Sequence, residues 1–163
     1  MIAKKKVSIV SVIVSFSAVF AVGGLGTTIS PLGPWYKTLT LPAWQPPGPV
    51  FGIVWTTIFV LTAISAALAW RDVDKPNAGR TLIGLFVFNG AMNLLWSFLF
   101  FKVQRPDWAL MQVGFLWLSV LALIVFIAPR NKIASGLLMP YIIWVTIASV
   151  LNFDVVRLNA PFS

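Results

Sequence analysis

Five apolar stretches, each long enough to cross a bilayer as a helix, dominate this sequence. Each meets the requirement of about 20 residues for spanning roughly 30 Å of hydrocarbon. Only 10% of the residues are charged, against about a quarter in an ordinary globular domain. The sequence therefore predicts an all-α membrane protein, a single domain of residues 1–163 folded as a five-transmembrane-helix bundle. The expected spans are residues 7–29, 48–70, 81–101, 108–128 and 133–156.

Basic residues lie at the ends of these stretches and not along one solvated face, so the net charge of +8 reflects membrane topology and we expect no nucleic-acid partner. The positive-inside rule then places the N-terminus in the cytoplasm. We expect an integral protein of a bacterial cell membrane, surrounded by lipid. The N-terminal side carries Lys4, Lys5, Lys6, Arg71, Lys75, Arg80, Arg130 and Lys132, and the other side carries Lys37, Lys102, Arg105 and Arg157.

The N-terminal segment has two interpretations. Three lysines followed by an apolar run resemble a secretory signal, with Val19, Phe20 and Ala21 as a cleavage site. The apolar run continues to Ile29, however, which is longer than the apolar part of a usual signal. We therefore favour a retained membrane helix.

The sequence contains neither cysteine nor histidine. Disulfides, thiol nucleophiles, zinc sites and imidazole acid–base catalysis are thereby excluded. A bound haem would lack the two commonest axial ligands. We expect no metal site, no covalently bound cofactor and no conventional enzyme.

Residues 30–47 form the longest connection, and the charge argument places it outside. Its prolines favour an extended backbone, and Pro49 fits the first turn of the helix that follows. That helix carries aromatic side chains at a spacing of four, which puts them on one face. We predict a rigid lid containing Pro42, Pro46 and Pro47, leading into an aromatic wall of Phe51, Trp55 and Phe59.

Two further faces bear polar or aromatic side chains inside apolar spans, where polar groups usually face a bundle interior or a cavity. One combines Asn89 and Asn93 with Trp96 and Phe100, and the other combines Tyr141, Trp144, Ala148 and Leu151. A rise of about 1.5 Å per residue puts both faces and the aromatic wall at a similar depth. That depth lies beneath the loop with Trp35, Tyr36 and Trp44.

Each of these residues also has a structural explanation. For Trp55 and Trp144, bundle packing and ligand contact fit the sequence equally well. Asn89 and Asn93 would each gain about 0.6 kcal/mol from bonding a neighbouring helix, an explanation that fits Asn93 as well as ligand contact does and fits Asn89 less well. Asp154, near the end of its span, is expected to be a surface charge without a catalytic role. Four tryptophans at span ends are expected to form an interfacial belt: Trp35, Trp44, Trp70 and Trp108.

With these residues in hand, the chain resembles the TspO/MBR family, the translocator proteins also called tryptophan-rich sensory proteins or peripheral benzodiazepine receptors. The resemblance covers nearly the whole chain. It implies a five-helix bundle, commonly a homodimer, whose pocket binds porphyrins such as protoporphyrin IX or haem, and isoquinoline carboxamide and benzodiazepine-type ligands. Its three blocks are WYKTLTLPAWQPPGPVFGIVW at 35–55, FNGAMNLLWSFLFF at 88–101 and PYIIWVTIASVLNFDVVRLN at 140–159.

The resemblance also implies roles for particular residues. Trp55, Asn89 and Trp144 match ligand-contacting residues of the family, and Ala148 matches a position where a small side chain affects binding. The same cavity would be lined by Tyr36, Pro46, Phe59 and Asn93. From their positions in the sequence, the candidate ligand-binding set is completed by Trp44, Phe51, Trp96, Tyr141 and Leu151.

The expected function is a membrane translocator or sensor that binds tetrapyrroles. One alternative is light-dependent porphyrin degradation, in which the resemblance would give Trp55 and Trp144 a catalytic role. Another is transport of porphyrins or sterols. The family's sterol pattern has a tyrosine where this chain has Phe153, between Leu151 and Arg157, so we rank sterols below tetrapyrroles.

Overall fold

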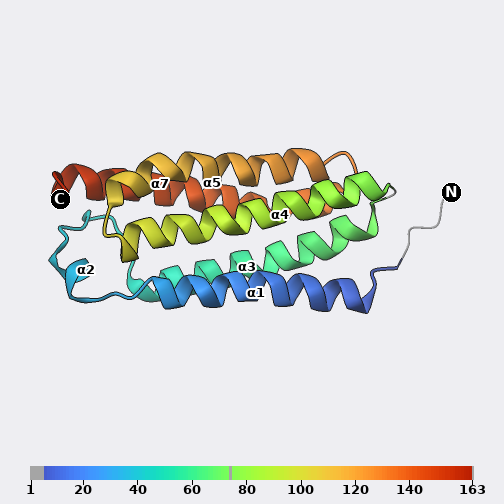
Figure 1. Ribbon diagram of the computed structural model, residues 1–163, viewed down its shortest axis with the longest axis horizontal. Coiled ribbons are helices and arrows are strands. Elements are labelled where there is room, and N and C mark those ends of the chain that lie inside the picture. The colour runs from blue at the N-terminus through green and yellow to red at the C-terminus, as the bar shows by residue number, and fades with distance from the viewer. Residues whose placement is uncertain (1–5, 74, 163) are drawn as a thin grey trace.

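The computed structural model describes residues 6–73 and 75–162, and its five long helices run side by side (Figure 1). A helix of 21 residues is about 32 Å long at 1.5 Å per residue, enough to cross a bilayer. All five are long and apolar enough to be membrane spans, which confirms the predicted all-α membrane fold. The long helices are α1 (Ile9–Ile29), α3 (Gly48–Arg71), α4 (Pro76–Ser97), α5 (Pro106–Ile127) and α7 (Met139–Asn159). Shorter elements are α2 (Pro34–Thr38), the π-helix η1 (Phe98–Lys102) and α6 (Lys132–Gly136).

Proline marks most helix starts, because it lacks an N–H that the first turn does not need. It stands in the first two positions of α2, α3, α4, α5 and α7. The third span therefore begins at Pro76, five residues before the expected start. Pro140 likewise starts a new helix, so the expected single span at residues 133–156 consists of α6 and α7 separated by Leu137 and Leu138.

The core centres on α5, which packs against α4 on one side and α7 on the other. Its buried positions recur at spacings of mostly three and four, the repeat of one helical face. They are Pro106, Ala109, Gln112, Val113, Leu116, Ser119, Val120, Leu123 and Ile127. Helix α1 is peripheral and packs on α3 and α4, and Gly23 is its one buried residue in the described chain.

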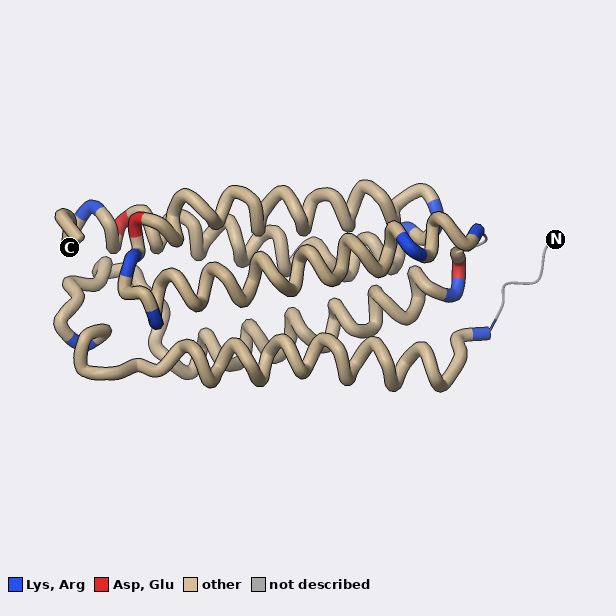
Figure 2. Tube along the Cα trace, in the orientation of Figure 1, with Lys and Arg blue, Asp and Glu red and all other residues tan. Residues whose placement is uncertain are grey.

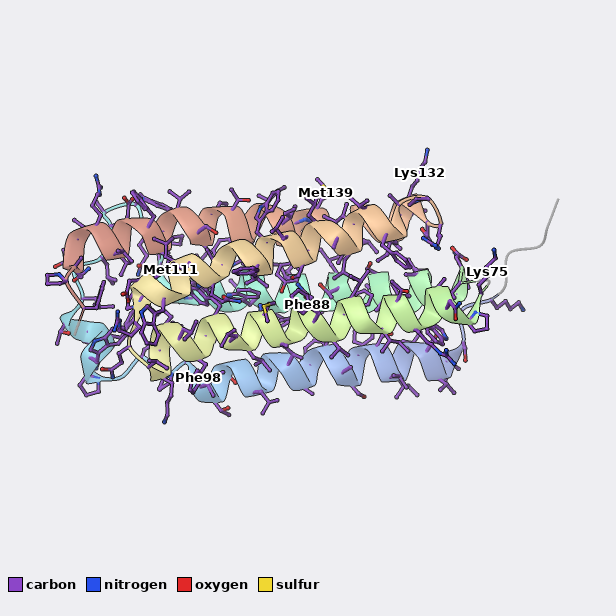
Figure 3. The ribbon with its side chains drawn as sticks, turned by 45° about the horizontal axis from the view of Figure 1, so that its top comes forward. Lys75, Phe88, Phe98, Met111, Lys132 and Met139 are labelled. Atoms are coloured by element: carbon purple, nitrogen blue, oxygen red, sulfur yellow. The ribbon has the colours of Figure 1, made fainter. Side chains whose placement is uncertain are left out.

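Charged residues gather at the two ends of the bundle, leaving the middle of every long helix uncharged (Figure 2). The described chain starts at one end, and α2 and the C-terminus lie at the other (Figure 1). Between the ends, large apolar side chains project outward, including Phe88, Phe98, Met111 and Met139 (Figure 3). An apolar girdle between two charged ends is the surface that a bilayer requires.

The end of the third span is a π-helix, which the sequence analysis did not anticipate. Val103 N–H donates to the carbonyl of Phe98, five residues back, at 2.9 Å. In an α-helix Trp96 and Phe101 would lie about 140° apart. The wider turn brings both Phe100 and Phe101 to Trp96, at ring distances of 5.2 and 6.1 Å. Gln104 then adopts a left-handed φ of 60° as the chain reverses into α5.

Candidate functional site

Side chains from α3 and α4 converge on the ring and hydroxyl of Tyr141 in α7. The amide Nδ2 of Asn93 in α4 donates to the Tyr141 hydroxyl at 3.1 Å, and both side chains are buried. The ring of Trp55 in α3 meets the Tyr141 ring edge-on at 6.0 Å. These three predicted residues therefore do lie together, at one level between α3, α4 and α7.

Asn89 lies one turn away from Asn93 and joins α4 to α5. Its Nδ2 donates to the hydroxyl of Ser119 at 2.8 Å, and that hydroxyl donates to the Leu116 carbonyl at 2.6 Å. Asn89 thus links α4 to α5 through a hydrogen bond, which is the structural role weighed for it in the sequence. The sequence analysis missed Ser119, although a small polar residue on the α5 face that carries Leu116 and Val120 was a usable signal.

Trp144 lies one turn along α7 from Tyr141, with 8% of its surface exposed. Its ring meets Phe51 of α3 edge-on at 5.5 Å. Its indole N–H is buried and finds no acceptor among the described residues. A buried donor without a partner costs about 1–3 kcal/mol, so this N–H is available to a guest that brings an acceptor.

The predicted aromatic wall does not remain flat along α3. A spacing of four residues turns by about 40° per step, so Phe51 and Phe59 point about 80° apart. Phe51 faces Trp144, whereas Phe59 stacks on Trp55 at 5.5 Å and reaches α1. There a Cβ on Gly23 would lie 2.7 Å from Phe59 Cε2, so only glycine allows this approach.

The loop of residues 30–47 covers the end of the bundle and is tied to α7. Trp44 Nε1 donates to Asp154 Oδ2 at 2.9 Å, and Asp154 also pairs with Arg157 at 3.1 Å. Asn159 Oδ1 accepts from the Thr40 N–H, and Asn159 Nδ2 donates to the Thr40 carbonyl, both at 2.8 Å. Asp154, expected as a surface charge near the end of its span, is therefore also a bonded anchor for the loop.

The remaining candidates occupy this covered end or its border. Tyr36 packs on Phe101 at 5.8 Å and accepts from Gln45 Nε2 at 3.3 Å. Trp35 contacts Phe100 at 6.2 Å and packs against the buried cluster of Phe100, Ala109 and Val155. Trp44, with 45% of its surface exposed, faces outward. The half-buried candidates are Pro46, Trp96, Ala148 and Leu151.

Apolar side chains pack around Tyr141 and Trp144. Tyr141 and Trp144 belong to one buried cluster with Ile58, Val113, Leu116, Val120, Ile142 and Val145. Two hollows, of about 270 and 440 Å³, lie elsewhere on the described chain, the larger between α4 and α5 along Met92, Trp108 and Met111.

No group of three or more acidic, histidine or cysteine side chains is placed to hold a metal among the described residues. What the site offers is ring surface, amide and hydroxyl groups and the buried indole donor of Trp144. Aromatic faces stack on planar apolar molecules, and a few placed polar groups fix orientation. Chemically, the arrangement suits recognition of a flat, mostly apolar guest.

Fold and site together define a small integral membrane protein, with five candidate spans around an aromatic and amide-bearing interior beneath a bonded loop. The sequence model of the TspO/MBR family matches residues 11–158. The chain belongs to the TspO/MBR family, as its three sequence blocks predicted.

Relatives from all three domains of life support this membership. The tryptophan-rich protein TspO of Chlorobaculum tepidum is 37% identical over 141 residues, which cover 85% of this chain and 89% of the relative. The tryptophan-rich protein TspO of Archaeoglobus fulgidus is 36% identical over 155 residues, covering 94% and 99%. The translocator protein of Homo sapiens is 29% identical over 126 residues, covering 77% and 75%.

Proposed function

We propose that this protein binds a tetrapyrrole such as protoporphyrin IX between α3, α4, α5 and α7, beneath the loop of residues 30–47. The observation that carries the proposal is the buried indole N–H of Trp144, which lacks an acceptor while its ring packs against Phe51. A porphyrin supplies both a flat apolar face and ring nitrogen or carboxylate acceptors. Trp55 and Tyr141 then offer further ring surface to the same guest.

Titrating protoporphyrin IX into the detergent-solubilised protein, followed by the porphyrin absorbance, tests this proposal. Trp144→Phe keeps an aromatic ring and removes the donor, so it should weaken binding about 2- to 12-fold, the range of one hydrogen bond of about 0.5–1.5 kcal/mol. Trp108→Phe, at an exposed tryptophan, is the matched control and should leave affinity unchanged. Equal affinity of wild type and Trp144→Phe would show that the Trp144 N–H does not donate to the porphyrin.

A second candidate function is light-dependent oxidation of bound protoporphyrin by oxygen. The contact between the Trp55 and Tyr141 rings favours it, because both side chains are oxidisable and meet at the proposed binding site. Porphyrin absorbance should then decay under illumination in air, and the Trp55→Phe, Trp144→Phe double variant should abolish the decay. Decay at the wild-type rate in that variant would show that these tryptophans do not take part in the oxidation, and would leave the protein with a binding role alone.

We further propose that the N-terminus faces the cytoplasm and that the protein is a homodimer. Because the chain has no cysteine, single cysteines at exposed Lys37 and Lys132 report opposite faces without background labelling. In intact cells, an impermeant maleimide should label Lys37→Cys and spare Lys132→Cys. The reverse labelling would invert the orientation, and light scattering of the purified protein would decide the oligomeric state.

A further inference from the structure

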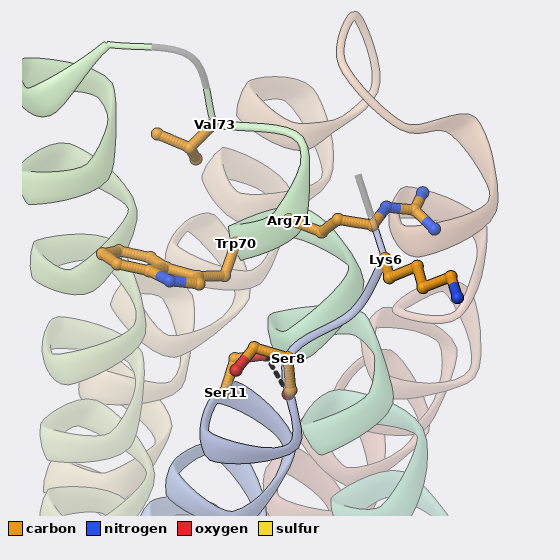
Figure 4. A pocket seen from close by; sticks show the side chains of 6 residues that line it. All are labelled: Lys6, Ser8, Ser11, Trp70, Arg71 and Val73. Carbon is orange, nitrogen blue, oxygen red and sulfur yellow. Dashed lines mark hydrogen bonds between the residues drawn. The ribbon is translucent and has the colours of Figure 1, made fainter. Parts of the chain in front are cut away.

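A hollow of about 270 Å³ lies at the N-terminal end of the bundle, far from the proposed porphyrin site (Figure 4). It opens between the start of α1 and the end of α3. The residues that line it are Lys6, Ser8, Ser11, Trp70, Arg71 and Val73. Nothing in the proposed function uses any of them.

Two cationic side chains border this hollow and extend in the same direction, those of Lys6 and Arg71 (Figure 4). Asp72 holds the Arg71 guanidinium through Nε at 2.7 Å and Nη2 at 2.8 Å, and Asn131 Nδ2 donates to the same carboxylate at 2.7 Å. Arg71 is thus fixed in place before any ligand arrives. The Lys6 ammonium has no hydrogen-bond or ion-pair partner among the described residues.

The local charge matches one phosphodiester. Lys6 and Arg71 contribute two positive charges and Asp72 one negative charge, which leaves a net charge of about +1. Other basic residues stand at the same end of the bundle, Lys75 and Arg80 at the start of α4 and Arg130 and Lys132 between the end of α5 and the start of α6. Figure 3 labels Lys75 and Lys132 there. Ser8 begins α1 without a side-chain cap, so the positive end of this helix adds to the same field.

The surroundings of the hollow match the rest of a phospholipid. Trp70 is 45% exposed at the end of α3, the position where indole rings sit at the level of lipid headgroups. Below the hollow, α1 presents the apolar side chains of Ile9, Val10 and Ile13 to the outside, the most exposed being Ile9. An acyl chain can lie along that face while the headgroup stays at the cations.

We propose that this hollow binds the phosphate of an anionic phospholipid in the leaflet on the N-terminal side. Basic pockets between membrane helices are suited to anionic headgroups, and each lysine or arginine near the surface contributes roughly 1 kcal/mol. Lys6 is the primary contact because its charge is unpaired. Arg71, held by Asp72, positions the phosphate against it.

Native mass spectrometry of the full chain in detergent, with phosphatidylglycerol or phosphatidylcholine added, tests the proposal. We expect phosphatidylglycerol to bind more tightly than phosphatidylcholine. Lys6→Gln should weaken that binding about fivefold. Lys132→Gln removes an equally exposed lysine outside the hollow and should have little effect.

Lys6 makes no contact that the fold needs, so its substitution tests binding and not stability. Equal losses in Lys6→Gln and Lys132→Gln would show diffuse attraction to the basic end and overturn the site. So would equal binding of the two lipids. Inorganic phosphate that binds the lipid-free protein at millimolar concentration and is lost in Lys6→Gln would assign the hollow to a soluble anion and overturn the lipid.

Discussion

Replacing Gly23 by alanine tests how closely α1 is fitted against the aromatic interior. The new Cβ would lie 2.7 Å from Cε2 and 2.9 Å from Cδ2 of Phe59. Carbon atoms in good contact are about 3.5–4.0 Å apart, so the overlap is about 0.6–1.3 Å. On its other side the Phe59 ring is stacked on Trp55 at 5.5 Å, which restricts how it can move away.

The expected change in the free energy of unfolding has two opposing contributions. Overpacking of this kind costs about 1–3 kcal/mol, while alanine is favoured over glycine inside a helix by about 1 kcal/mol. Gly24 and Gly26 provide controls in the same helix, since a Cβ at either meets no heavy atom within 4 Å. Gly24→Ala gains the propensity alone, so Gly23→Ala should be less stable than Gly24→Ala by about 1–3 kcal/mol.

Reversible unfolding in detergent micelles by titration with dodecyl sulfate measures this difference in the free energy of unfolding. The double variant Gly23→Ala, Phe59→Leu should recover much of the loss, because the smaller side chain vacates the clashing position. Equal stabilities of Gly23→Ala and Gly24→Ala would refute the reasoning. Strictly additive effects in the double variant would do the same, since they would show that the two sites do not touch.

Three further predictions concern bonded polar side chains. Asp154→Ala removes the acceptor of Trp44, so backbone amides of residues 30–47 should exchange hydrogen about 2- to 12-fold faster while those of α4 stay unchanged. Asn93→Leu and Tyr141→Phe should couple by about 0.6 kcal/mol in a double-mutant cycle on unfolding, and zero coupling would contradict the bond between them. Asn131→Ala removes the side-chain cap of α6 together with the bond from Asn131 to Asp72 and should lower the free energy of unfolding by at least about 1 kcal/mol, whereas an unchanged value would show that neither bond contributes.

The sequence predicted those features of the fold that a bilayer imposes on any chain that spans it. A span needs about 20 apolar residues, so the number of long helices could be predicted and only their ends shifted. Polar groups inside those spans have to face inward, which brought Asn93 and Tyr141 into contact as their positions suggested. Trp55 also contacts Tyr141, because aromatic side chains at one depth on neighbouring helix faces have few other partners.

The remaining features depend on partners that lie far apart in the sequence. The bond from Trp44 to Asp154 joins residues 110 positions apart, and Thr40 and Asn159 are 119 apart. Nothing in the local pattern selects those pairs. The π-helix could not be predicted either, because a run of phenylalanines fits an α-helix equally well. The contact between Trp96 and Phe101 forms only in the folded chain.

The two ends of the candidate site are held with unequal strength, which bears on how a guest reaches it. On the inner side, α5 packs along its length between α4 and α7, and buried bonds such as Asn89 to Ser119 tie the helices together. At the loop end, the loop is tied to α7 by three exposed bonds from Trp44 and Asn159, together worth about 1.5–4.5 kcal/mol. The rings of Trp35 and Tyr36 also pack on Phe100 and Phe101 there. Separating α5 from α7 would expose a whole buried face, at about 25 cal/mol per Å² of apolar surface. Lifting the loop is therefore the less costly route, and access to Trp144 should be controlled by Asp154 and Asn159.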